Sequence, residues 1–240
     1  MKRIFAYFAV GAALCQAAIA GEVTVATASN FLPTAETIAE RFEAETEHSV
    51  VLMHGSTGQL YAQILSGAPI DIYLSADRQR PLALKNDGLA TGAKTYAHGR
   101  LVLVSRVAVN PDEASSAFEG KRVGLADPIV APYGLAATSA MERLNLDTAT
   151  FQPLLVANVG QVATLFATGN VDLAFISASL LPRLDAPFVL SLEGRHRQIR
   201  QDAALLARAA DNEAANEFWS FLFSERAGVL IEAGGHGVPE

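Results

Sequence analysis

The sequence has 240 residues, of which 50% are hydrophobic and 18% are charged, so it can bury one large core or two smaller ones. With 25 acidic residues against 18 basic ones, the formal net charge is −7, which argues against a nucleic acid or an anionic membrane surface as partner. The one cysteine, Cys15, lies near the N-terminus. The rest of the chain therefore has no disulfide, thiolate nucleophile or cysteine metal site.

The first twenty residues have the pattern of a secretory signal. Two basic residues precede an apolar run over residues 4–14, and Ala18 and Ala20 mark a cleavage site before Gly21. An uncleaved membrane anchor would need an apolar run of about 20 residues, and the lone cysteine lacks a leucine at the lipobox position. We therefore expect residues 1–20 to be removed and the protein to be periplasmic. Loss of the two basic residues leaves 16 against 25 acidic ones, a net charge of −9.

Two polar turns stand out at the start of the mature chain. The strands predicted at residues 23–28 and 50–53 each lead through such a turn into a segment with helical spacing. The first N–H groups of a helix have no intrahelical partner, and the helix dipole favours an anion there. The turns add four uncharged polar side chains: Ser29, Asn30, Ser56 and Thr57. Each turn alone is more typical of a helix cap, but together they indicate a site for a small oxyanion.

The remaining pattern alternates strands and helices. The sequence predicts strand 22–28, helix 33–46, strand 50–53, a helix ending near residue 66, strand 70–74, helix 80–87, strand 98–104, loop 108–117, strand 122–126, helix 135–144, strand 154–157, helix 161–168, strand 171–176, strand 199–207, and helices 214–223 and 225–233. This order predicts an α/β protein with two lobes, each a doubly wound, mainly parallel sheet with flanking helices, and a ligand in the cleft between them. We expect the first lobe to comprise residues 21–97 and 204–240, and the second residues 98–203.

An enzyme is the competing class. The segment 55–58 is one residue short of the Gly-x-Ser-x-Gly elbow of a serine hydrolase. Asp127 is better interpreted as a turn residue than as a catalytic acid. The five histidines lack metal-ligand spacing: His48, His54, His98, His196 and His236. We therefore expect no catalysis.

Several blocks of the chain resemble a known family. They are Val23–Phe31, Gly55–Ile64, Gly67–Asp77 (Gly-Ala-Pro through Ser-Ala-Asp), Ala126–Pro128 and Phe166–Asn170. Together they are similar to the periplasmic molybdate-binding protein of molybdate ABC transporters, over nearly the whole mature chain. The resemblance implies a type II periplasmic solute-binding fold that captures molybdate or tungstate between its lobes.

The resemblance also implies the site. Ser29 and Asn30 match the first contact, Thr57 beside Ser56 the second, and Tyr133 and Val159 contribute backbone N–H groups from the second lobe. Many members place a tyrosine after the strand that ends here at Ile176, where this chain has Ser177. The metal is held only as its oxyanion, without direct protein–metal ligands and without a cofactor. A monomer that delivers the anion to a membrane permease is expected, and ATP use belongs to a partner. Sulfate, phosphate, ferric iron or a small organic acid on the same fold remain alternative ligands.

Overall fold

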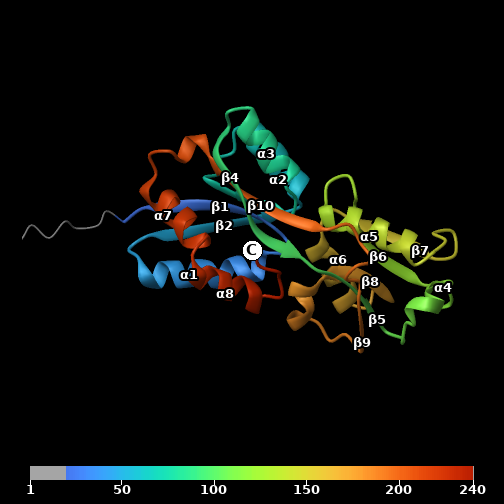
Figure 1. Ribbon diagram of the computed structural model, residues 1–240. Coiled ribbons are helices and arrows are strands. Elements are labelled where there is room, and N and C mark those ends of the chain that lie inside the picture. The colour runs from blue at the N-terminus through green and yellow to red at the C-terminus, as the bar shows by residue number, and fades with distance from the viewer. Residues whose placement is uncertain (1–19, 240) are drawn as a thin grey trace, which may run out of the picture.

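The computed structural model describes residues 20–239, so the predicted signal peptide, apart from Ala20, lies outside the described residues. Within that range the chain forms two five-stranded sheets, each covered by helices, which lie side by side as two lobes (Figure 1). The first sheet contains β1 (Glu22–Ala28), β2 (Ser49–Gly55), β3 (Ile72–Leu74), β4 (Ala90–Gly99) and β10 (Ile199–Leu206). The second contains β5 (Leu101–Ser105), β6 (Arg122–Ala126), β7 (Gln152–Val156), β8 (Leu173–Ser177) and β9 (Phe188–Ser191).

Both sheets have the same strand arrangement. The order is β2-β1-β3-β10-β4 in the first and β7-β6-β8-β5-β9 in the second. The first three strands of each are parallel, the fourth is antiparallel to both of its neighbours, and the fifth again follows the majority direction. Four strands of five thus run one way, which confirms the mainly parallel, doubly wound prediction.

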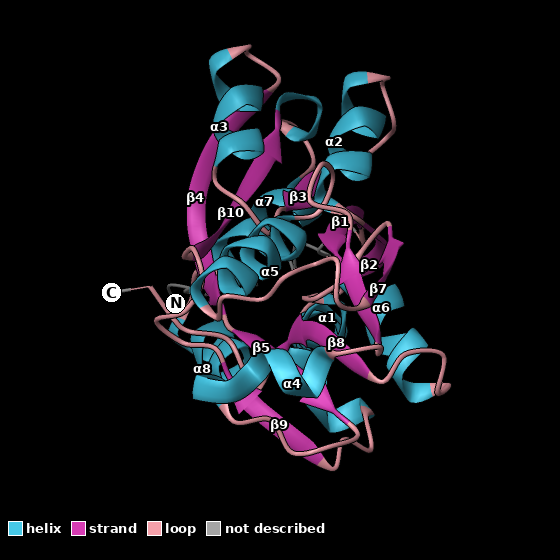
Figure 2. Cartoon of the chain, turned by 90° about the vertical axis from the view of Figure 1, so that its right-hand side faces the viewer, coloured by secondary structure: helices cyan, strands magenta, loops and turns pink. Residues whose placement is uncertain are grey.

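Five of the eight helices in the described residues directly follow parallel strands, and three come after the antiparallel strands β5 and β10. The helices of the first lobe are α1 (Leu32–Glu45), α2 (Thr57–Leu65), α3 (Gln79–Asn86), α7 (Glu213–Leu222) and α8 (Glu225–Ala233); those of the second are α4 (Ala114–Phe118), α5 (Pro132–Arg143) and α6 (Val159–Ala167). Short 3-10 helices lie at Pro111–Glu113, Ala178–Arg183 and Ala207–Ala209. Figure 2 shows β4 and β10 running together beside α3. No helix within residues 20–239 is long and apolar enough to cross a membrane.

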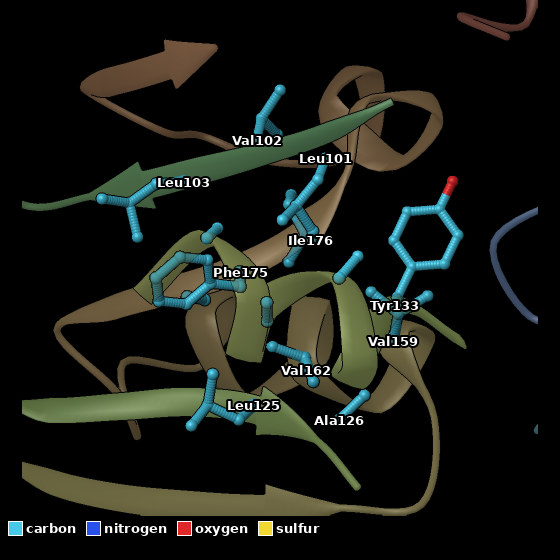
Figure 3. Packing of buried hydrophobic residues seen from close by; sticks show 14 of the residues in the cluster. Leu101, Val102, Leu103, Leu125, Ala126, Tyr133, Val159, Val162, Phe175 and Ile176 are labelled. Carbon is cyan, nitrogen blue, oxygen red and sulfur yellow. The ribbon is translucent and has the colours of Figure 1, made fainter. Parts of the chain in front are cut away.

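Each lobe has its own core. In the first lobe, aromatic rings bring α1 and the C-terminal helices together, because Phe42 packs edge-on against Phe218 with their ring centres 5.2 Å apart. In the second lobe, Leu103 and Phe175 from the sheet pack above α6, which contributes Val162 (Figure 3). The two cores are largely separate, although Ala28 and Ala76 of the first lobe pack with the core of the second.

The connection from β4 to β5 corrects one prediction. The apolar run 98–104 was expected to be a single strand, but Gly99 still pairs with Ile199 in the first sheet, whereas Leu101 already pairs with Ser177 in the second. Only Arg100 lies between them. An apolar pattern records burial and not the partner strand, so it cannot show where a strand changes sheets.

The return connection falls before β10. All of β10 pairs with β3 and β4, so residues 199–203 belong to the first sheet, although the sequence analysis assigned them to the second lobe. We propose that the lobes divide at Arg100 and in the segment 192–198. Two further elements were not predicted: the edge strand β9, and α4 inside the expected loop.

Candidate functional site

Four strand-to-helix turns meet where the lobes face each other. Two come from the first lobe, β1 to α1 and β2 to α2, and two from the second, β6 to α5 and β7 to α6. They enclose a small cavity of about 10 Å³ lined by Ala28, Ser29, Asn30, Gly55, Ser56, Thr57, Ala76, Ala131, Pro132, Tyr133, Asn158 and Val159. Six of the seven predicted site residues are in this wall, and none of its residues carries a charge.

Backbone N–H groups without a protein acceptor gather in the cavity wall. Within residues 20–239, the backbone N–H donates no hydrogen bond at Asn158, which is 9% exposed, or at five more deeply buried lining residues: Asn30, Ser56, Thr57, Tyr133 and Val159. All five residues are at most 3% exposed. Buried N–H groups in folded proteins are almost always paired, so this arrangement suits a ligand that presents several acceptor oxygens.

Helix capping holds two of these turns in shape. Ser56 Oγ accepts from Gln59 N at 3.3 Å at the start of α2, and Asn158 Oδ1 accepts from Gln161 N at 3.0 Å at the start of α6. Each cap satisfies the N–H group of the third residue of its helix. The first N–H groups of α2 and α6 therefore remain available to the cavity. At Ser56 the capping and oxyanion interpretations hold together, whereas the turn at Ser29 and Asn30 provides no side-chain cap for α1.

Two hydroxyl groups act as acceptors toward the protein. Thr57 Oγ1 accepts from Ala76 N at 3.1 Å, and Ser29 Oγ accepts from Gly160 N of the second lobe at 3.2 Å. Each hydroxyl uses a lone pair in this bond, which leaves its hydrogen free to donate elsewhere. Both hydroxyls can thus donate to a ligand oxygen without losing a protein contact.

Ser177 takes a position behind the cavity wall. Its Oγ donates to the Tyr133 hydroxyl at 2.8 Å and lies 2.7 Å from Ser179 Oγ, which in turn donates to the Asn30 carbonyl at 2.7 Å. Burial raises the pKa of the Tyr133 hydroxyl, so this group stays protonated. Ser177 does not line the cavity with the other six residues. Ser177 therefore supports Tyr133 directly and Asn30 through Ser179.

Two supporting residues were missed by the sequence analysis. Asn30 Nδ2 donates to Gln201 Oε1 at 2.7 Å, and Gln201 Nε2 lies 3.3 Å from His236 Nδ1. Both partners are 0% exposed and come from β10 and the C-terminal segment. This buried chain of contacts fixes the Asn30 amide beside the cavity. Nothing in the local sequence around Gln201 or His236 signals it.

The buried histidine predicts how stability depends on pH. Burial, and then the charge of Arg100, lower the pKa of His236 to about 4, against about 6.5 for an unfolded histidine. The unfolded state therefore takes up the proton first, and the free energy of unfolding should fall as the pH drops from about 6.5 to about 4. The gap between the two values corresponds to about 3 kcal/mol.

Urea unfolding at neutral pH and at about pH 4 measures this loss. His236→Gln should lose less stability over the interval than the unsubstituted chain, by about the amount above. The control is His54→Gln, since His54 is exposed. An equal pH dependence in the unsubstituted chain and in His236→Gln would contradict the assignment of this stability loss to His236.

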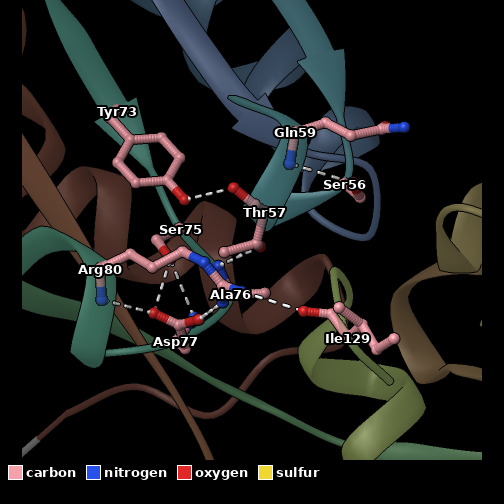
Figure 4. A network of polar contacts seen from close by, with 9 residues as sticks. All are labelled: Ser56, Thr57, Gln59, Tyr73, Ser75, Ala76, Asp77, Arg80 and Ile129. Atoms are coloured by element: carbon pink, nitrogen blue, oxygen red, sulfur yellow. Dashed lines mark hydrogen bonds and ion pairs between the residues drawn. The ribbon is translucent and has the colours of Figure 1, made fainter. Parts of the chain in front are cut away.

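A charged pair lies next to the cavity wall in the chain, after Ala76. Asp77 pairs with Arg80 at the start of α3, and Ser75 Oγ contacts the same carboxylate at 3.3 Å (Figure 4). Arg80 Nη2 also donates to the Ile129 carbonyl of the second lobe at 3.3 Å. Together with Gly58 N, which donates to the Val130 carbonyl at 2.8 Å, this contact joins the two lobes beside the cavity.

Comparison with known proteins gives the family. Residues 23–236 match the model of the bacterial extracellular solute-binding proteins. The molybdate-binding protein ModA of Azotobacter vinelandii is 35% identical, covering 99% of this chain and 98% of the relative, and ModA of Rhodobacter capsulatus is 34% identical, covering 91% and 89%. The solved structure of the Azotobacter vinelandii periplasmic molybdate-binding protein superimposes with a TM-score of 0.84 at 32% identity, covering 91% of this chain and all of that one. The chain belongs to the bacterial extracellular solute-binding proteins and, within them, to the ModA type.

Proposed function

We propose that this protein binds molybdate or tungstate as the intact oxyanion and delivers it to the permease of an ABC transporter. The observation that carries the proposal is the set of five buried, unpaired N–H groups around a cavity without charged side chains. The ModA relatives support the same ligand. We further propose that the protein acts as a periplasmic monomer and catalyses no reaction.

The donor set fits a dianion. A hydrogen bond from a neutral donor to a charged oxygen contributes roughly 1.5 to 3 kcal/mol, and each helix N-terminus adds about 0.3 to 1 kcal/mol. Seven donors are available: the five N–H groups and the hydroxyls of Ser29 and Thr57. These hydrogen bonds replace those that the anion makes with water, which is what a site without a countercharge requires.

The wall also discriminates among anions. No carboxylate lines the cavity, so a ligand that carries an O–H group, such as hydrogen phosphate, finds no strong acceptor for it. Sulfate carries no O–H group, so its exclusion rests on its smaller size. Direct coordination of ferric iron is disfavoured because residues 20–239 contain no group of three or more His, Cys, Asp or Glu side chains that could hold a metal ion.

Isothermal titration of residues 21–240 with five ligands tests the proposal. Molybdate and tungstate should each bind tightly at one site per chain, whereas sulfate, phosphate and ferric citrate should give no heat of binding under the same conditions. If sulfate bound as tightly as molybdate, the proposed selectivity for molybdate and tungstate would be wrong. No heat of binding with any oxyanion would contradict the proposal and would leave helix capping as the role of the turns before α2 and α6.

A further inference from the structure

A positively charged groove lies beside the cavity, between the lobes. Its volume is about 450 Å³, and its wall includes Arg78, Arg80, Arg197 and Arg200 but only one acidic residue, Asp77. It shares Ala76 and Pro132 with the wall of the anion cavity. We name this feature the arginine groove.

The arginine groove carries an excess of positive charge. Arg80 pairs with Asp77, and the buried Asp202 lies 3.9 Å from Arg78 and 3.5 Å from Arg200. Two carboxylates thus face four guanidinium groups. Within residues 20–239, the exposed Arg197 side chain takes part in no ion pair, so its charge is uncompensated.

This local charge opposes the field of the whole molecule. The chain has a net charge of −7, and −9 without residues 1–20, so a dianion is repelled at long range. The cavity itself offers only dipoles, which act over short distances. The arginine groove next to the cavity wall opposes that field locally, over about one Debye length, roughly 10 Å at 0.1 M salt.

We propose that the arginine groove steers the oxyanion toward the cleft and raises its association rate without forming the bound-state contacts. This inference rests on the proposed function, because it requires a dianionic ligand. Charges that act only during approach change the association rate constant and its salt dependence, while the dissociation rate constant stays nearly constant.

The test is the association rate of molybdate with the Arg197→Glu variant, followed by stopped flow. A fluorescent dye on Gln59→Cys serves as reporter, because Gln59 is exposed on the first turn of α2 and the chain after Cys15 contains no other thiol. At low salt the association rate constant should fall about threefold, and about fivefold when Arg78→Gln is added. The loss should disappear at high salt, and the dissociation rate constant should change by less than about 1.5-fold.

Lys121→Glu is the matched control, because it makes the same change in net charge at the far end of β6. That strand begins at Arg122, and its other end leads toward the cavity. This variant should keep the association rate within about 1.5-fold at every salt concentration. An equal fall in both variants, or a change confined to dissociation, overturns the proposal. Failure of the unsubstituted chain to bind molybdate in calorimetry would instead overturn the proposed function.

Discussion

Replacing Ser29 and Thr57 together by alanine is expected to raise the Kd for molybdate by at least about a hundredfold. Each substitution removes a hydroxyl that can donate to the ligand while accepting from a backbone N–H, Gly160 N for Ser29 and Ala76 N for Thr57. Losing two charge-assisted donors costs about 3 kcal/mol, and each 1.4 kcal/mol is a factor of ten. Calorimetry on the double variant measures the change directly.

The control for this pair is Thr37→Ala with Ser220→Ala. Both side chains are exposed on helices and bond only to carbonyls of their own helix, Thr37 to Pro33 and Ser220 to Asn216. The same atoms are removed, but the Kd should stay within about twofold. Thermal unfolding of both double variants separates a binding defect from a folding defect. A Kd within about threefold of the starting value for the Ser29 and Thr57 variant would contradict the site.

The second large effect is expected from Gly134→Ala on the first turn of α5. A Cβ at this position would lie 2.3 Å from the Ala126 carbonyl oxygen, 2.7 Å from Pro128 N and 2.9 Å from Asp127 C. All three are backbone atoms and cannot rotate away, so α5 has to shift and takes Tyr133 with it. We expect a loss of about 3 kcal/mol in the free energy of unfolding and a large loss of molybdate affinity.

Urea unfolding and calorimetry measure the two losses. Gly228→Ala is the matched control, because Gly228 is inside α8 and a Cβ there would meet only Val238 Cγ1, at 3.9 Å. Alanine in that helix interior should stabilise the protein by roughly 0.5 to 1 kcal/mol and leave the Kd unchanged. A Gly134→Ala variant as stable as the control would contradict the prediction, because it would show that the turn after β6 can rearrange to accommodate the methyl group.

The sequence predicted the parts of the fold that local patterns determine. Strand 122–126 and helix 225–233 have the predicted bounds, and α1 begins one residue before the predicted Pro33. The strand β4 was missed over most of its length because its segment, Ala-Thr-Gly-Ala-Lys-Thr-Tyr-Ala-His-Gly, has no apolar run. It forms a strand because all eight residues of β10 pair with it, and tertiary pairing outweighs weak local preference.

The site likewise has parts that local sequence patterns predict and parts that depend on long-range contacts. Ser29, Asn30, Ser56 and Thr57 could be predicted because the carboxyl ends of adjacent parallel strands share one edge of a sheet. The contacts behind them could not, because they join residues far apart in the chain. Asn30 and Gln201 are separated by 171 positions. Nothing local to either residue identifies its partner.

The position of β10 in the first sheet also affects which lobe can be completed first during synthesis. Strand β10 lies between β3 and β4, yet it comes last among the strands. Until residues 199–206 exist, β4 has no strand of the first sheet to pair with, because both β3 and β4 pair with β10. The second sheet, in contrast, has all its strands once residue 191 has been made. Closing the first sheet joins segments more than a hundred residues apart, and such closure is slow. A growing chain can therefore complete its second lobe while its first sheet still lacks the strand that lies between β3 and β4.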